Sequence, residues 1–461
     1  MSDDGWSRRD FGKGAMALGA ASLLGCPEPD PTPADPPPVP PPQGVILITA
    51  DDLGWRDLAA YGLTAIATPA LDALVADSVG FSRAFDVVST CSSSRATYAT
   101  GQYPHTHGVT GLVHRHPELS LPPTHPTFMR TLQDAGWATA IQGKWHLSDV
   151  ERPEAFGFDT YLPTNIDQVI DTSNDAIWWL QDHRDSRFYL ELNYMQPHRD
   201  VFGDYPQQAG FEVDEAVATP PDWWGLPDWP EIRAEVAGYL SRLRWMDALI
   251  GEVLGALEGA GLAEDTLVVF VSDNGPAFPG CKTTLYDRGV GTPLLFRWPA
   301  GLTAGERDEL VSSVDLAPTI LDLLGIDGLP DAQGRSLAPT LRGDPDWAPA
   351  TALFSEHERH AGGEKPTRAV RTERFKYIRN LNDVPWGDGG GNGAWKEALA
   401  LEPDQTWDEP RPPEELFDLE ADPLERVNLA TDPAFAGELD AMRGRLADWM
   451  AATDDARLPE L

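Results

Sequence analysis

Short runs of apolar residues alternate along most of the chain with longer stretches in which apolar positions recur at helical spacing. Residues 45–50 (VILITA) and 267–271 (LVVFV) are continuous apolar runs, the pattern of strands buried on both faces. Weaker strand patterns lie at 139–141, 188–194 and 294–296, and helical spacing predicts helices at 69–79, 231–261 and 315–324. Strands that alternate with helices predict an α/β fold, with a parallel sheet and helices on both of its faces.

The character of the chain changes near residue 350. Residues 374–378 and 415–418 have the pattern of strands in a small separate sheet, and 434–450 has the spacing of a closing helix. We therefore expect a main α/β domain over 44–349 and a smaller C-terminal α+β subdomain, with an antiparallel sheet, over 350–461.

The N-terminus has the pattern of an export signal rather than of a folded element. A twin arginine (Arg8, Arg9) precedes an apolar run that ends at Cys26, so residues 1–26 resemble a twin-arginine signal that ends in a lipobox. Proline supplies ten of the sixteen residues after Cys26, which predicts an extended linker over 27–43. We expect export by the twin-arginine machinery to the periplasm or cell surface, with membrane contact only through a lipid on Cys26. An apolar N-terminal helix with chance arginines is the alternative.

The chain is strongly acidic: its 461 residues include 35 Lys+Arg and 73 Asp+Glu, a formal net charge of −38. Such a charge repels phosphate backbones and anionic lipid, so nucleic acid is not expected as a partner. The field is screened within about 8 Å at physiological salt, so an anionic substrate requires a local cluster of cations. No apolar run reaches the ~20 residues that a membrane-spanning helix requires.

Hard oxygen ligands follow both of the buried strands. Asp51 and Asp52 come directly after the first, and Asp273 and Asn274 come shortly after the second. Ligands bind beyond the carboxyl ends of strands in an open parallel sheet, and clustered carboxylates require a cation between them. Oxygen ligands favour calcium or magnesium over zinc. The alternative is that each pair caps a helix or a turn.

A third motif, residues 90–101 (TCSSSRATYATG), predicts a helix that begins near Cys91 and ends at a glycine. Cys91 then lies at the positive end of the helix dipole, with Arg95 one turn further on the same face. Cys91 is then either a low-pKa thiolate or a modified residue, unless the segment is only a serine-rich cap with a buried cysteine. A disulfide between Cys91 and Cys281 is less favoured, because both lie inside polar motifs.

Cationic and titrating side chains follow other predicted strands. Lys144 and His146 lie in GKWH, His198 lies in QPHR, and Lys282 lies in FPGCK shortly after Asn274. Taken together they predict a pocket for an anion that gains charge in a transition state.

These motifs, in this order, resemble those of the sulfatases of the alkaline-phosphatase superfamily, and the match runs from about Val45 to the C-terminus. The spacing of 52 residues between His146 and His198 is most similar to the heparan N-sulfatase (sulfamidase) branch. The resemblance implies an alkaline-phosphatase-like α/β fold, in which a mixed, mostly parallel sheet is sandwiched by helices. It implies hydrolysis of a sulfate ester or sulfamate, on a sulfated carbohydrate or a small sulfate ester. It implies one calcium ion per chain, with magnesium less favoured, bound by Asp51, Asp52, Cys91, Asp273 and Asn274. It also implies a catalytic group formed by Cys91, Arg95, Lys144, His146, His198 and Lys282.

The resemblance further implies that a formylglycine-generating enzyme oxidises Cys91 to formylglycine, whose aldehyde hydrates to a geminal diol. One hydroxyl attacks sulfur, and removal of the proton from the second by His146 expels sulfate; a simple alcohol would leave a stable ester. The family signature usually has proline two positions after the cysteine, and here that position is Ser93. Serine there weakens recognition by the enzyme or points to a different one, and without conversion of Cys91 the diol mechanism is lost.

Several further residues have two interpretations each. In the sulfamidase-like interpretation the substrate mouth includes His105, His107, His114, Glu356 and His357. Solvated loop histidines are the favoured alternative. Trp223, Trp224 and Trp229 either stack on sugar rings or, as we favour, fix a loop onto the core.

Three function classes remain open at this stage. The first is a sulfate-ester or sulfamate hydrolase that acts on a glycan. The second is a phosphodiesterase or phosphonate hydrolase on the same scaffold, and the third is a catalytically silent, lipid-anchored glycan-binding protein. The negative net charge favours small or partly neutral substrates over long polyanions.

Overall fold

The computed structural model describes residues 39–162, 172–360, 363–385 and 409–461. Residues 40–461 form one compact unit. The twin-arginine segment, Cys26 and most of the proline-rich linker lie outside the described residues, so these expectations stay predictions, as does the boundary placed at residue 350. Among the described residues, no helix is both long enough and apolar enough to span a bilayer.

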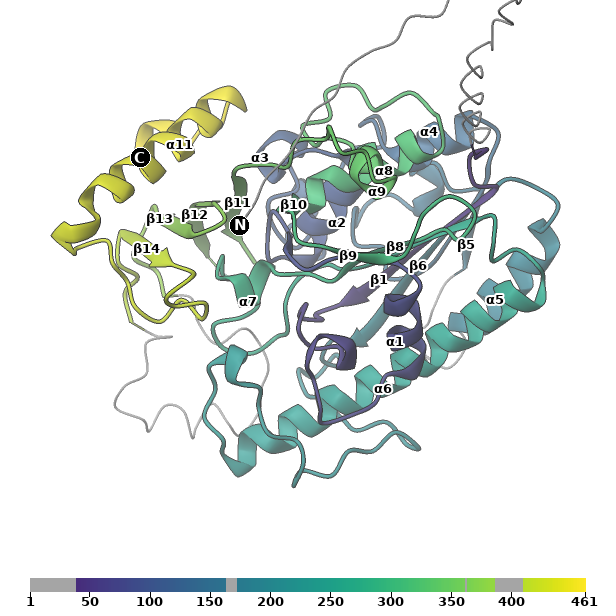
Figure 1. Cartoon of the computed structure of the whole chain (residues 1–461), viewed down its shortest axis with the longest axis horizontal. Helices are drawn as coiled ribbons and strands as arrows, with labels where there is room; N and C mark the ends of the chain where they lie inside the picture. The colour runs from purple at the N-terminus through teal and green to yellow at the C-terminus, as the bar shows by residue number, and fades with distance from the viewer. Residues whose placement is uncertain (1–38, 163–171, 361–362, 386–408) are drawn as a thin grey trace, which may run out of the picture. The chain divides into compact units, whose positions relative to one another are not determined.

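An eight-stranded sheet forms the centre of this unit (Figure 1). Its order is β5 (Thr160–Leu162), β4 (Ala138–Gly143), β6 (Phe188–Pro197), β1 (Gly44–Asp51), β7 (Thr266–Ser272), β8 (Leu294–Arg297), β2 (Val79–Phe81), β9 (Gly305–Arg307). The strands from β5 to β7 are parallel, and β8 runs antiparallel to both of its neighbours. The sheet is therefore mixed and mostly parallel, as predicted.

Helices cover both faces of this sheet (Figure 1). One face packs against α1 (Pro69–Ala76), α5 (Thr172–His183) and α6 (Pro230–Gly259), and the other against α2 (Cys91–Thr100), α4 (Phe128–Asp134), α8 (Leu316–Leu323) and α9 (Ala338–Leu341). Successive side chains of a strand point to opposite faces. Accordingly, Ile46 and Ile48 of β1 belong to the first core, and Val45 and Leu47 belong to the second. Burial on both faces explains why β1 is a continuous apolar run.

A second sheet is antiparallel and has the order β11 (Leu353–Arg359), β12 (Glu364–Arg371), β13 (Phe375–Asn380), β14 (Glu414–Asp418). The closing helix α11 (Ala436–Ala452) packs on it through Leu439, Met442 and Leu446. The remaining elements are short: the parallel pair β3 (Ala84–Phe85) and β10 (Val311–Ser312), and the helices α3 (Pro104–His107) and α7 (Asp287–Val290). The predicted C-terminal antiparallel sheet is confirmed.

The main strands and helices predicted from the pattern are present, with two kinds of difference. The helix predicted over 69–79 ends at Ala76, and Val79 begins β2 instead. The strands β11 and β12 were not predicted, because the buried polar residues Glu356, His357 and Arg368 interrupt their apolar pattern.

Candidate active site

The predicted catalytic and metal-binding residues lie beyond the carboxyl ends of neighbouring parallel strands. Strand β1 ends at Asp51, whose register partner in β6 is Pro197, and Ala50 pairs with Ser272 at the end of β7. The residues that follow these strands are therefore brought to one edge of the sheet. The Asp52 backbone N–H donates to Asp273 Oδ1 (3.2 Å), and Asn274 Nδ2 donates to Asp52 Oδ1 (2.7 Å).

Cys91 is the first residue of α2 and lies beside these oxygens. Its Sγ is 3.5 Å from Asp51 Oδ1, 3.5 Å from Asn274 Oδ1 and 4.0 Å from Asp52 Oδ1. The side chain is only 1% exposed. Burial, and then the negative charge of Asp273, raise the pKa of the Cys91 thiol to about 12. An unmodified Cys91 is therefore a neutral thiol, despite the helix dipole. Of the two predicted alternatives, the low-pKa thiolate is wrong.

The cysteines do not form a disulfide: Cys91 and Cys281 are both free and buried. Every residue of α2 is buried, and the helix ends at Gly101, which has a positive φ of 66°. The predicted helix start and stop are thus both present.

Three cations face the carboxylates. Lys144 Nζ is 2.5 Å from Asp51 Oδ2, and Lys282 Nζ is 2.5 Å from Asp52 Oδ1 and 3.2 Å from Cys91 Sγ. Arg95 lies one turn after Cys91 and donates through Nε to Asp273 Oδ2 (2.9 Å).

Burial and the neighbouring cations shift the pKa values of the acids in opposite directions. Burial raises the pKa of Asp51, but the positive charges of Lys144, His198, Arg95 and Lys282 outweigh it and hold that pKa well below its usual value. The pKa of Asp273 is raised to about 6, by burial and then by the charge of Asp51. The pKa values of two acids in one cluster are thus shifted in opposite directions, down for Asp51 and up for Asp273.

Strand β4 delivers Lys144 and His146 through a sharply turned backbone. Gly143 has φ +93°, and a Cβ there would lie 2.0 Å from the carbonyl oxygen of Asn193. The pKa of His146 is well below its usual value because of burial, and then of the charges of Lys144 and Arg95. His146 is consequently a neutral imidazole at neutral pH.

His146 has a partner that lies at the surface. Its Nε2 is 2.8 Å from Nδ1 of the exposed His114, and the two rings stack with centroids 5.0 Å apart. The other nitrogen of His146, Nδ1, is buried and makes no hydrogen bond to a described residue. His198 lies on the far side of the cluster, 28% exposed, with Nε2 3.6 Å from Asp52 Oδ2.

The other predicted mouth residues are held inside the protein. Both ring nitrogens of His107 are used, by Thr97 Oγ1 (3.2 Å) and the backbone N–H of Val109 (3.1 Å). His105 gives Glu356 two hydrogen bonds, from its backbone N–H (2.6 Å) and through Nδ1 (2.5 Å). The interpretation of these two histidines as solvated loop residues is wrong.

Glu356 and His357 are both buried. Arg368, which is 1% exposed, links Glu356 to the C-terminal segment, with Nε 3.5 Å from Glu356 Oε2 and 2.5 Å from Asp455 Oδ2. A buried charge cluster therefore ties β11 and β12 to α3 and to the end of the chain, and of the predicted mouth residues only His114 is exposed.

The tryptophan loop packs as we favoured. Trp223 and Trp224 donate their ring N–H groups to Asp57 Oδ1, at 2.9 and 3.1 Å, and Trp224 is buried in the core below. Trp229 packs against the same core and is partly buried.

One residue near the cluster was not predicted. His360 directly follows β11, and its pKa is lowered well below the usual value by burial and then by the charges of Lys282, His357, His198 and Lys144. The pKa of His360 thus responds to the charges of the cluster around Cys91. No sequence motif singles it out, because it comes from the polar strand whose pattern was missed.

Comparison with known proteins agrees with this geometry. The sulfatase family model matches residues 43–326, and a model described as N-sulphoglucosamine sulphohydrolase, C-terminal, matches residues 281–387. The chain is 33% identical to human N-sulphoglucosamine sulphohydrolase, over 90% of this chain and 91% of that protein. It is 27% identical to a Δ4,5-hexuronate-2-O-sulfatase of Bacteroides thetaiotaomicron, over 89% of each.

Solved structures share the fold. One, a protein in complex with its substrate D-glucosamine-2-N,6-O-disulfate, superposes with a TM-score of 0.70 at 21% identity, covering 90% of this chain and 99% of that one. Another, a 2-O GAG sulfatase, gives 0.69 at 23% identity, covering 91% and 94%. The chain therefore belongs to the sulfatase family, as a sulfuric ester hydrolase of alkaline-phosphatase-like fold that most resembles the sulfamidase branch.

Proposed function

We propose that this protein removes sulfate from an amino sugar, with an N-sulfated glucosamine as the first substrate to test, by calcium-dependent hydrolysis through a formylglycine at position 91. The observation that carries the proposal is the buried cradle of carboxylates and lysines around Cys91 Sγ. The preference for an N-sulfate rests on the match to human N-sulphoglucosamine sulphohydrolase over nearly the whole of both chains. Sulfate esters of glycans are the alternative substrates.

The residues present fit a calcium ion. Ligand atoms of Asp51, Asp52, Cys91 and His198 lie within 4.8 Å of one another, and Asn274 Oδ1 faces the same Sγ. Asp52 Oδ2 is buried and accepts no hydrogen bond from a described residue. Calcium takes oxygen ligands. Asp51, Asp52 and Asn274 have such oxygens, and the formylglycine proposed at position 91 would replace the Cys91 sulfur by another. When bound, the ion supplies positive charge to the sulfuryl oxygens.

Position 91 suits a modified nucleophile. A hydrated formylglycine supplies one hydroxyl that attacks sulfur and a second whose deprotonation releases sulfate. Ser93, the departure from the family pattern, is the third residue of α2, where the backbone N–H is not needed for the helix. Its hydroxyl is buried without a hydrogen-bond partner among the described residues. The serine therefore adds no interaction to the folded site, and its effect falls on recognition of the unfolded chain.

The side chains divide the remaining tasks. Lys144 and Lys282 face the sulfuryl oxygens, and Arg95 fixes Asp273 and the start of α2. His146, neutral and with Nδ1 unused, takes the proton that releases sulfate. His198, partly exposed at the opening, assists departure of the leaving group together with Lys282.

Mass spectrometry of the peptide that contains position 91 tests the nucleophile directly. We expect the thiol to be replaced by an aldehyde, and a fully retained thiol in active protein would refute the formylglycine route. Turnover of N-sulfoglucosamine, glucosamine 6-sulfate, an aryl sulfate and an aryl phosphodiester, with and without a chelator, then identifies the substrate class. Cys91→Ala should abolish turnover, whereas Cys281→Ala, at the other buried cysteine, should not. A converted protein that hydrolyses only the phosphodiester would overturn the proposal.

We also propose export and lipid anchoring through Cys26, on the strength of the twin-arginine pattern. Replacing Arg8 and Arg9 by lysine should retain the protein in the cytoplasm. Replacing Cys26 by alanine should release it from membranes without blocking export. Membrane association that persists in the Cys26 variant would contradict the anchor.

A further inference from the structure

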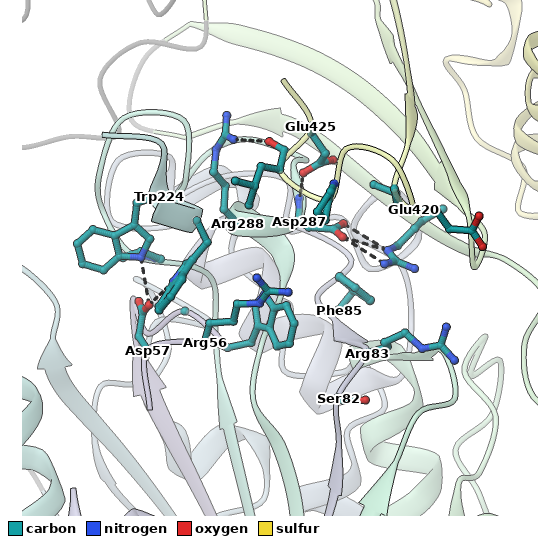
Figure 2. A pocket seen from close by; sticks show the side chains of 18 of the residues that line it. Arg56, Asp57, Ser82, Arg83, Phe85, Trp224, Asp287, Arg288, Glu420 and Glu425 are labelled. Carbon is teal, nitrogen blue, oxygen red and sulfur yellow. Dashed lines mark hydrogen bonds and ion pairs between the residues drawn. The ribbon is translucent and has the colours of Figure 1, made fainter. Parts of the chain in front are cut away.

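A cavity of about 220 Å³ lies where the loop after β1 meets α7 and the C-terminal sheet (Figure 2). We call it the Arg56 pocket; its wall includes Trp55, Arg56, Arg83, Asp287 and Arg371. None of the proposed metal or catalytic residues lines it. Two of its wall residues, Gly54 and Pro276, nevertheless lie two positions after Asp52 and Asn274. The pocket is therefore separate from the cluster at Cys91 but shares its two loops.

The guanidinium of Arg56 is the uncommitted cation of this pocket. It lies over the ring of Trp55, 4.4 Å from the centroid, and the side chain is half-buried. The structure gives it no hydrogen bond or ion pair with a described residue. Trp55 is itself fixed, because its ring packs against Gly291, where a Cβ would lie 2.4 Å from Cδ1. Stacking thus holds the guanidinium in place and leaves its N–H donors free.

The carboxylates of the pocket are already engaged by other groups. Asp287 accepts from Arg371 Nη2 (3.2 Å) and Lys376 Nζ (2.7 Å). Asp57 is bound by the ring N–H groups of Trp223 and Trp224 and by the hydroxyl of Tyr239 (2.8 Å). In Figure 2 the Arg56 guanidinium points into the space between Asp57 and Asp287.

Glu425 pairs with Lys376 Nζ at 2.9 Å. Arg83, the other arginine near the opening, already donates to Glu373 (3.0 Å). A guanidinium stays charged at neutral pH and offers a planar fork of donors that matches a carboxylate or a tetrahedral oxyanion. The charge of Asp287 acts on Arg56, but that carboxylate is already bound by Arg371 and Lys376. Arg56 is therefore a half-buried cation without a hydrogen-bonded or ion-paired anion among the described residues.

We propose that the Arg56 pocket binds an oxyanion, a sulfate or a carboxylate group, outside the catalytic cluster. The ligand is either free inorganic sulfate or the anionic group of a sugar, since both present the same oxygens to the guanidinium. Binding requires no turnover at position 91, so this inference stands independently of the proposed function.

Crystals of the whole protein soaked in selenate, an isostere of sulfate with an anomalous signal, locate the site. We expect a peak within hydrogen-bonding distance of the Arg56 guanidinium, and its absence in Arg56→Gln crystals. Arg83→Gln is the matched control, because Arg83 lines the same pocket and is already paired. Peaks confined to the cluster around Cys91, or a pocket peak that persists in the Arg56→Gln protein, would overturn the proposal.

Calorimetry at constant ionic strength distinguishes the two sources of the anion. All proteins in this experiment also have the substitution Lys282→Gln, because it weakens competing anion binding at the cluster around Cys91. Arg56→Gln should weaken pocket binding by about tenfold or more, as expected for loss of a charged hydrogen-bond donor, whereas Arg83→Gln should change it less than about threefold. Tighter binding of a sulfated or uronic sugar than of sulfate identifies the sugar, and equal affinities identify the free anion. No binding of either ligand would refute the proposal; Arg56→Lys replaces Arg56→Gln if the latter does not fold.

Discussion

Replacement of Lys282 by glutamine should separate transition-state stabilisation from general stability. Lys282 Nζ lies 3.2 Å from Cys91 Sγ and 2.5 Å from Asp52 Oδ1, and the side chain is almost fully buried. Burial lowers the pKa of Lys282, but the negative charges of Asp52, Asp51 and Asp273 outweigh it, so the pKa lies well above its usual value and the ammonium stays charged at working pH. In the proposed mechanism, the substitution removes this charge from the point where sulfuryl charge develops.

The expected loss follows from the distance. Two unit charges 3.2 Å apart interact by about 5 kcal/mol at an effective dielectric constant of about 20. If about half a charge develops on the sulfuryl oxygens, the loss is about 2.6 kcal/mol, or roughly 80-fold in rate. This agrees with the roughly 10²- to 10³-fold effect of removing one donor from an oxyanion site. Lys282→Arg, which keeps the charge, should recover part of the loss.

The assay is kcat/KM for sulfate release, with Lys376→Gln as the matched control. Lys376 is an equally buried lysine that pairs with Asp287 (2.7 Å) and Glu425 (2.9 Å), outside the catalytic cluster. Both variants should lose stability, and the folded fraction is measured by thermal melting. After this correction, Lys376→Gln should retain kcat/KM within about threefold. A Lys282→Gln enzyme that loses less than the control would refute the role assigned to Lys282.

Three further perturbations test other parts of the molecule. Arg368→Met should cost about 3–5 kcal/mol in chemical denaturation, because it leaves buried Asp455 unpaired. Burial raises the pKa of Asp455, but the hydrogen bond and charge of Arg368 outweigh it and lower the pKa. The loss of free energy of unfolding in Arg368→Met should therefore be full at neutral pH and shrink as the pH falls through that pKa. A loss that does not depend on pH would contradict this. His146→Ala should lower kcat by about 10²–10⁴-fold. His114→Ala should lower kcat less and leave KM unchanged, with partial rescue by imidazole. A change in KM as large as the change in kcat would argue for a binding role. Gly143→Ala should destabilise by more than about 1 kcal/mol and reduce sulfate release, because its Cβ meets the Asn193 carbonyl at φ +93°; wild-type melting would exclude that strain.

The sequence was most informative where burial is simplest. The strands β1 and β7 are apolar on both sides, so their ends, and the carboxylates that follow, were evident without a structure. The start of α2 at Cys91 also followed from local chemistry, from its serines and its terminal glycine. Parallel pairing then places Asp51 and Asp273 together, because the carboxyl ends of parallel strands share one edge.

The sequence was least informative where charges pair inside the protein. Strand β12 contains Arg368, which pairs with Asp455, 87 positions away, so no local pattern marks it as buried. His105 lies in the four-residue helix α3, in a polar segment that has the pattern of a loop, and its partner Glu356 is 251 positions away. His360 was missed for the same reason, since only the tertiary fold brings it near Lys282.

The complete burial of α2 has a consequence for how the protein is made. All ten of its residues are buried, and Cys91 is 1% exposed, in contact with Asp51, Asn274 and Lys282. A maturation enzyme that must grip an extended segment can reach this one only while the polypeptide is still unwound. Supplying such an enzyme to purified, already folded material should therefore leave the thiol untouched, whereas co-production during synthesis should convert it.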